Sequence, residues 1–182
     1  MISYEVILGF ARAYPLIIIS SILLSYFLTS NTDLLLLGIF LSINDIINHY
    51  LKTLIFKPLI GGKNLPFLGL GKRPVGAKNC GIFKKCPAEI ATSYGMPSGH
   101  SQNAVFFSTY VILTLINSNF IYAIKVYGIV LFIFLALGIM YSRVYLKCHT
   151  VQQVIAGGLI GGILGALYFK NKDKIKKFLK LH

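Results

Sequence analysis

The sequence contains few acidic residues: Asp and Glu together number 5 in 182 residues, against 18 Lys and Arg. Charged residues of either sign make up 13% of the chain, whereas about a quarter is usual in soluble domains. Hydrophobic residues make up 55%, which excludes an intrinsically disordered chain. Three cysteines are too few for a small secreted module that is held together by disulfides. The low share of charged residues and the high share of hydrophobic ones exclude a soluble enzyme and indicate an integral membrane protein.

The net charge of +13 comes from basic residues that lie between apolar runs. On a soluble fold such an excess would suggest a patch that binds nucleic acid. In a membrane protein the same residues meet lipid head groups and phosphate-bearing substrates. We therefore expect membrane lipids and a phosphorylated substrate as partners, and no nucleic acid.

Apolar runs of about 20 residues predict membrane-spanning helices. They lie near residues 5–28, 34–56, 100–119, 121–142 and 149–169. The predicted fold is all-α: an integral membrane bundle of about five transmembrane helices that forms a single domain over residues 1–182. In the last run Gly157, Gly161 and Gly165 stand four residues apart. This spacing predicts the close approach of another helix.

Two polar segments lie outside the predicted helices. A loop over residues 57–99 is long enough to indicate a functional role. A basic tail over residues 170–182 carries Ile175, Phe178 and Leu179 at helical spacing, which is typical of an amphipathic helix on a membrane surface.

Helices that cross a membrane in succession bring alternate connections to the same side. The polar loop and the short connection before the last helix are therefore expected at one end of the bundle, and the basic tail at the other. The positive-inside rule places the tail in the cytoplasm and the polar loop on the lumenal or extracytoplasmic face. Cys80 and Cys86 would form a disulfide in an oxidising lumen, or remain two free thiols.

Basic and imidazole side chains are expected to gather at the loop end. The polar residues there are Lys52, Arg73, Ser98, His100, Arg143 and His149. Ionisable groups at membrane depth indicate function, and cations without a carboxylate partner indicate an anionic ligand. Phosphate is the leading candidate because an arginine presents a planar fork of donors to its oxygens.

The set of ligating residue types argues against a metal site. Mg²⁺ and Ca²⁺ need an acidic cluster, which this end lacks. Two histidines with a distant cysteine make a poor zinc site. We therefore expect neither a metal nor another cofactor.

Three separated motifs occur in a fixed order. They are Arg73-Pro74, Pro97-Ser98-Gly99-His100, and Ser142-Arg143 followed six residues after Arg143 by His149. This arrangement resembles the three-part signature of the type 2 phosphatidic acid phosphatase (PAP2) superfamily. The resemblance implies a helical membrane phosphatase in which His149 attacks phosphorus, His100 protonates the leaving oxygen, and water then releases phosphate from His149.

The resemblance also implies which groups hold the phosphoryl oxygens: Arg73, Arg143, Ser98 and the backbone N–H of Gly99. The family places a lysine seven residues before the arginine of the first motif, but that position is Pro66 here. Lys52, displaced by an apparent insertion, is our candidate. The competing lysines are Lys57, Lys63 and Lys72.

Gln153 stands where many family members carry an aspartate four residues after the nucleophilic histidine. A glutamine still accepts the imidazole N–H but offers no negative charge. We interpret Gln153 as the residue that orients the nucleophile. The alternative is a helix residue that merely faces the bundle.

The segments YGMPSGHSQ at residues 94–102 and YSRVYLKCHT at residues 141–150 are similar to the dolichyldiphosphatase branch of the family. This resemblance implies hydrolysis of a dolichyl or other polyprenyl diphosphate to the monophosphate, in the endoplasmic reticulum membrane if the source is eukaryotic. Two alternatives remain open. One is a phosphatase for phosphatidic acid or another lipid phosphate, and the other is a non-catalytic lipid-binding protein.

Overall fold

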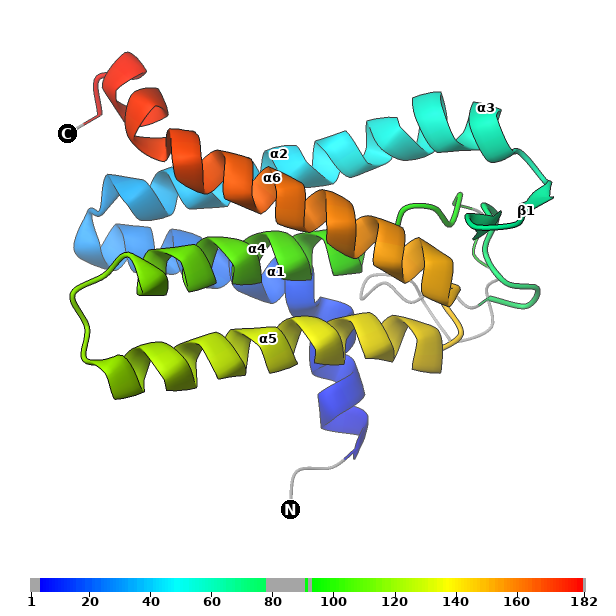
Figure 1. Cartoon of the computed structure of the whole chain (residues 1–182), viewed down its shortest axis with the longest axis horizontal. Helices are drawn as coiled ribbons and strands as arrows, with labels where there is room; N and C mark the ends of the chain where they lie inside the picture. The colour runs from blue at the N-terminus through cyan, green and yellow to red at the C-terminus, as the bar shows by residue number, and fades with distance from the viewer. Residues whose placement is uncertain (1–3, 78–90, 92, 182) are drawn as a thin grey trace.

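The computed structural model describes residues 4–77, 91 and 93–181. Long helices dominate it (Figure 1). They are α1 (Tyr4–Thr29), α2 (Thr32–Tyr50), α4 (Gly99–Ile116), α5 (Tyr122–Tyr145) and α6 (Val151–Phe178). After α2 the chain continues through the π-helical turn η1 (Leu51–Phe56) into the short α3 (Lys57–Ile60). Strands β1 (Asn64–Leu65) and β2 (Gly69–Leu70) form a small antiparallel hairpin.

Four stretches of helix are long and apolar enough to cross a membrane. They are Val6–Thr29, Thr32–Ile60, Tyr122–Tyr145 and Val151–Phe178. The fifth helix, α4, buries the polar side chains of Ser101, Gln102 and Asn103 and packs against α1, α2, α5 and α6. Because other helices surround it, its polar side chains meet protein rather than lipid. The predicted helical membrane bundle is confirmed.

α6 packs most extensively against α4, along the predicted glycine stripe. A Cβ atom added at Gly157, Gly161 or Gly165 would lie within 2.6 Å of a backbone oxygen of α4 or of its N-cap residue Ser98. Only glycine leaves room for the two backbones at this distance. The stripe therefore fixes α6, and the residues just before it, against the first turns of α4.

The two predicted polar segments differ from expectation in their bounds. Helical structure continues to Ile60, so the loop begins later than residue 57. α6 runs without a break to Phe178, so the tail does not start a separate surface helix. No proline or glycine interrupts the sequence after Gly165, and Lys176 pairs with Asp33 of α2 at 3.0 Å. The tail is therefore an extension of the last helix.

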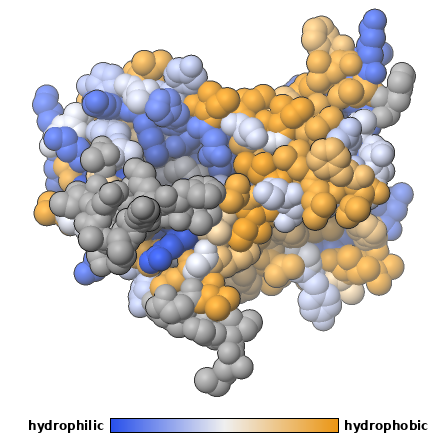
Figure 2. All heavy atoms as spheres, turned by 180° about the vertical axis from the view of Figure 1, so that it is seen from behind, coloured by the Kyte–Doolittle hydropathy of each residue, from blue (hydrophilic) through white to orange (hydrophobic). Residues whose placement is uncertain are grey.

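The connections are sorted between the two ends of the bundle as the alternation predicts. In Figure 1 the hairpin, the start of α4 and the turn between α5 and α6 lie at one end, and the C-terminus lies at the other. Figure 2 shows hydrophobic side chains over the middle of the molecule and hydrophilic ones at the hairpin end. The polar end of the bundle is therefore where a site for a charged ligand is built.

Candidate active site

The predicted site residues come from five separate elements that meet at the hairpin end. Lys52 lies in η1, and Arg73 lies in the loop after β2. Ser98, Gly99 and His100 lie at the start of α4. Arg143 lies in the last turn of α5, and His149 and Gln153 lie on either side of the start of α6. Hydrogen bonds join Gln153 directly to His149 and Ser98, and the charges of Arg73, Lys52 and Arg143 act on His149. The sequence prediction that these residues converge agrees with the structure.

Gln153 is fully buried and bonds in two directions. Its amide Nε2 donates to the backbone oxygens of Leu70 at 2.8 Å and Lys72 at 2.7 Å. Its Oε1 accepts from the Thr150 N–H at 3.3 Å and lies 3.0 Å from Nδ1 of His149. One side chain therefore ties the loop that leads into the first motif to the imidazole of the third.

These bonds determine the tautomer of His149. The carbonyl groups around Nε2 of Gln153 accept hydrogen bonds, so the amide cannot be turned over without losing both of them. Oε1 must therefore face the imidazole, and Nδ1 of His149 must carry the proton that it donates. The lone pair then lies on Nε2, which is the arrangement of a nucleophile.

His149 is also held neutral by its surroundings. It is 4% exposed. Burial lowers the pKa of its imidazole well below the usual range, and the positive charges of Arg73, Lys52 and Arg143 lower this pKa further. Lys52 also interacts electrostatically with the carboxylate of Asp45. A phosphate group would add further negative charge beside the three cations.

The guanidinium of Arg73 is positioned by the loop on one side and the nucleophile segment on the other. Its Nη1 donates to the backbone oxygen of Cys148 at 3.0 Å, one residue before His149. Its Nε and Nη2 donate to the backbone oxygen and hydroxyl of Ser93 at 3.2 and 3.0 Å. Ser93 carries no motif signal, and sequence analysis missed it.

The first turn of α4 offers backbone donors to an anion. The N-cap residue Ser98 makes no side-chain capping bond; its hydroxyl accepts from Ser101 at 3.0 Å. Its N–H donates to the backbone oxygen of Gln153 at 3.0 Å. The N–H groups of Gly99 and His100 lie in the first turn of α4, where N–H groups have no acceptor within the helix and the helix dipole is positive. A Cβ at Gly99 would lie 3.1 Å from Asn48 Oδ1, so a side chain there would press on α2.

Two of the predicted site residues also contact backbone oxygens of α1, which sequence analysis missed. Pro15 lies inside α1 and has no N–H for the oxygen of Ala11. That oxygen lies 3.5 Å from Nη1 of Arg143, which is 1% exposed. The next oxygen along, that of Arg12, lies 3.0 Å from Nε2 of His100. A proline within a long apolar helix was the signal available in the sequence.

Lys52 lies in the π-helical turn, a local widening of the helix that is common at functional sites. Its charge acts on His149. The competing residues Lys57, Lys63 and Lys72 are exposed. This favours Lys52 for the lysine of the first motif.

A buried polar network joins α2 to α4 next to the predicted site residues. Asn48 donates to Oε1 of Gln102 at 2.8 Å, and Gln102 donates to Oδ1 of Asn44 at 2.8 Å. Asn44 bonds to Asn103, which in turn donates to Asp45 at 2.7 Å. Sequence analysis missed this network. The spacing of the two α2 asparagines, one helical turn apart in an apolar run, was its signal.

Among the described residues, no three or more His, Cys, Asp and Glu side chains group so as to hold a metal ion. The expectation that catalysis needs no metal stays a prediction. Cys148 is disulfide-bonded. The pairing predicted between Cys80 and Cys86 falls on residues outside those that the structure describes.

Comparison with known proteins gives a family and several relatives. The family model described as "PAP2 superfamily" matches residues 14–177. "Lipid phosphate phosphatase gamma" of Arabidopsis thaliana is 32% identical over 144 residues, 74% of this chain and 62% of that protein. "Dolichyldiphosphatase 1" of Homo sapiens is 31% identical over 137 residues, 71% of this chain and 48% of that protein. "Dolichyldiphosphatase" of Saccharomyces cerevisiae is 30% identical over 190 residues, 96% of this chain and 70% of that protein.

The chain spans less than two thirds of the length of the Arabidopsis and human relatives. No solved structure matches the chain significantly.

Proposed function

The chain belongs to the PAP2 superfamily, and we propose that it is a membrane lipid phosphatase that hydrolyses a polyprenyl (dolichyl) diphosphate to the monophosphate. One observation carries the proposal. The Gln153 amide fixes the proton of His149 on Nδ1 and leaves the lone pair on Nε2, while the charges of Arg73, Lys52 and Arg143 act on the imidazole. The substrate class is supported by the relatives named dolichyldiphosphatase.

In the first step, Nε2 of His149 attacks the terminal phosphorus atom, and the bond from that phosphorus to the bridging oxygen breaks. In the substrate complex the negative charge of the diphosphate favours the doubly protonated imidazole of His100, which gives one proton to the bridging oxygen. The products are a lipid monophosphate and a phosphohistidine. The leaving oxygen takes the place of the Arg12 carbonyl as the acceptor of the His100 Nε2–H.

In the second step, water attacks the phosphorus atom of the phosphohistidine. The neutral imidazole of His100 takes a proton from this water, and the nitrogen–phosphorus bond breaks. Inorganic phosphate leaves, and both histidines return to their starting states. No metal or other cofactor enters either step.

The phosphoryl oxygens gain charge in both transition states. Arg73 and Arg143, with Lys52, supply the cations, while Ser98 and the N–H of Gly99 supply hydrogen-bond donors. Donors that are already in place where charge develops give the largest share of catalysis in many enzymes. The hydrogen bonds of Arg73 to Ser93 and Cys148 keep its guanidinium in place without substrate.

We also propose an orientation and a compartment. The Lys-rich end of α6 lies away from the site and faces the cytoplasm by the positive-inside rule. The site then faces the lumen or the extracytoplasmic space. In a eukaryotic cell the membrane would be that of the endoplasmic reticulum.

The test is phosphate release by purified protein in detergent with EDTA, with dolichyl diphosphate compared against phosphatidic acid. His149→Ala should abolish release while its circular dichroism matches that of the parent. His49→Ala is the matched control, because His49 is exposed on α2, and it should keep full activity.

Each outcome decides between candidate functions. Preference for the diphosphate supports the proposal. Preference for phosphatidic acid keeps the mechanism and moves the substrate to the class named for the Arabidopsis relative. Release no faster than His149→Ala on both lipids points to a non-catalytic lipid-binding protein. Loss of activity in EDTA contradicts metal independence.

A further inference from the structure

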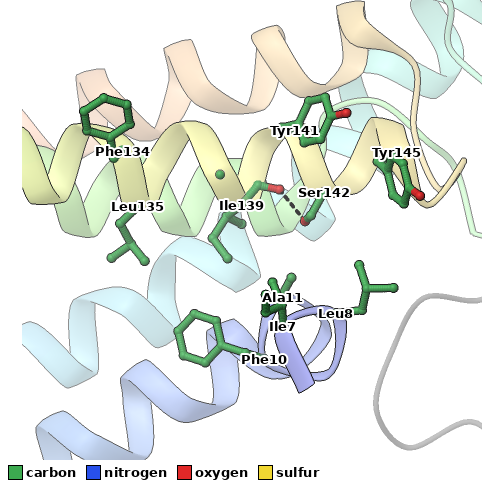
Figure 3. Close-up of a pocket in the computed structure, with 11 residues that line it drawn as sticks. Ile7, Leu8, Phe10, Ala11, Phe134, Leu135, Ile139, Tyr141, Ser142 and Tyr145 are labelled. Carbon is green, nitrogen blue, oxygen red and sulfur yellow. Dashed lines mark hydrogen bonds between the residues drawn. The ribbon is translucent and has the colours of Figure 1, made fainter. Parts of the chain in front are cut away.

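An apolar groove of about 510 Å³ lies between α1 and α5. Figure 3 shows side chains of the two helices facing one another across it. Its lining residues are Ile7, Leu8, Phe10, Ala11, Phe134, Leu135, Gly138, Ile139, Tyr141, Ser142 and Tyr145. The hydroxyl of Ser142 is satisfied by the backbone oxygen of Ile139 at 2.6 Å, so the groove wall offers little polarity.

One end of this groove meets the phosphate-binding groups. Ala11 lines the groove, and its backbone oxygen lies 3.5 Å from Nη1 of Arg143. Ser142, which also lines it, precedes Arg143 in the chain. A chain lying in the groove would therefore place its head beside the guanidinium of Arg143.

The groove also lies on the leaving-group side of the site. His100, the proposed acid for the leaving oxygen, reaches the backbone oxygen of Arg12 on α1. In the proposed reaction the leaving group carries the lipid. The lipid must therefore depart along α1, where one wall of the groove is formed by Ile7, Leu8, Phe10 and Ala11.

Two other apolar grooves lack this connection. One lies among α4, α5 and α6 and is lined by Val105, Met140 and Gly162, among others. Another lies where α2 passes α6 and reaches Asn171 and Ile175, near the far end of α6. Neither is lined by a residue that bonds to Arg143 or His100 through a contact given above.

We propose that the groove between α1 and α5 holds the first isoprene units of the substrate's polyprenyl chain. This inference rests on the proposed function and names the part of the protein that selects the lipid. A single groove that meets the phosphate site suits a lipid with one chain, whereas phosphatidic acid has two. In a membrane the gain comes from close packing against both helices rather than from escape from water.

Gly138→Leu tests the proposal by filling the groove. A Cβ at Gly138 would meet no atom within 4 Å, so the larger side chain enters open space without displacing the core. Gly9→Leu is the matched control. A Cβ at Gly9 also meets nothing within 4 Å, and at about 100° per residue this position faces away from the α1 groove wall.

We expect Gly138→Leu to raise the KM for dolichyl diphosphate about tenfold, by the loss of chain packing. Its kcat with para-nitrophenyl phosphate, which has no chain, should equal that of the parent. Gly9→Leu should change neither value. An unchanged KM in Gly138→Leu would overturn the proposal, as would an equal rise in Gly9→Leu.

A second measurement does not depend on turnover. A polyprenyl phosphate with a photoreactive diazirine in its first isoprene units is cross-linked to the parent protein, and the labelled peptides are identified by mass spectrometry. Labels within residues 7–11 and 134–145 support the groove. Labels at the groove among α4, α5 and α6, or no labels, contradict it. If the parent releases no phosphate from any lipid, the proposed function fails while this experiment still decides the groove.

Discussion

Replacing Gln153 by glutamate distinguishes the role of its Oε1, which faces His149, from that of its Nε2, which bonds to the loop. Gln153→Glu keeps an oxygen opposite Nδ1 of His149 but removes the N–H donors to the backbone oxygens of Leu70 and Lys72, now bonded at 2.8 and 2.7 Å. Losing the donor of a buried hydrogen bond costs about 1–3 kcal/mol. Two such losses should lower the free energy of unfolding by about 2–6 kcal/mol.

The same change alters the chemistry of the nucleophile. A carboxylate beside His149 stabilises the protonated imidazole, so the pKa of His149 rises. The acid limb of kcat/KM should therefore move to higher pH than in the parent. The KM should rise as well, because the released loop no longer holds Arg73 against the Cys148 oxygen.

Unfolding is followed by denaturant titration in mixed micelles, and kcat/KM by phosphate release between pH 4 and 8. Gln152→Glu is the control: it makes the same chemical change one residue earlier, on an exposed side chain. If Gln153→Glu is as stable as Gln152→Glu, the amide does not hold the loop. If its acid limb stays in place, the side chain does not act on His149.

Two further predictions follow from the geometry. The pKa of His149 is lowered by burial and by Arg73, and its neutral form is the nucleophile. The ordinary pKa of histidine is about 6.5, and the plateau of kcat/KM should therefore extend to lower pH than this value. An acid limb at higher pH would contradict the assignment of His149 as the nucleophile. Gly161→Ala should destabilise the protein by about 1–3 kcal/mol relative to Gly162→Ala. A new Cβ would lie 2.1 Å from a backbone oxygen of α4 at Gly161, but 3.6 Å from its nearest neighbour at Gly162. Equal unfolding midpoints for the two variants would refute the packing argument.

The sequence was sufficient to predict the bundle and the end at which its polar groups gather. Apolar runs predict spans from length and composition alone, and alternation of the spans then assigns each connection to an end. The glycines of α6 predicted the close approach of another helix, because their four-residue spacing can be read from a single helix. The helix ends did not follow from the sequence in the same way: helical structure continues from α2 through η1 and α3 to Ile60, although Pro58 lies within that segment.

Motif order also placed the candidate site residues, but it did not give their hydrogen-bond partners. Gln153 could be interpreted only as an acceptor for His149, or as a residue facing the bundle. Its donors to the loop join residues 81 and 83 positions apart, and sequence spacing carries no information about such a contact. Ser93 is a similar case, since only the fold brings it to Arg73.

By itself, then, the sequence determined a membrane helix bundle with cations and two histidines at one end, because hydropathy, charge and helical spacing act along the chain. Tertiary structure alone decided which way the amide of Gln153 points, and so which nitrogen of His149 is free. It also decided that backbone oxygens of α1 reach His100 and Arg143, across 88 and 132 positions of the chain. These features arise where helices distant in sequence pack together, and the apolar groove between α1 and α5 has the same origin.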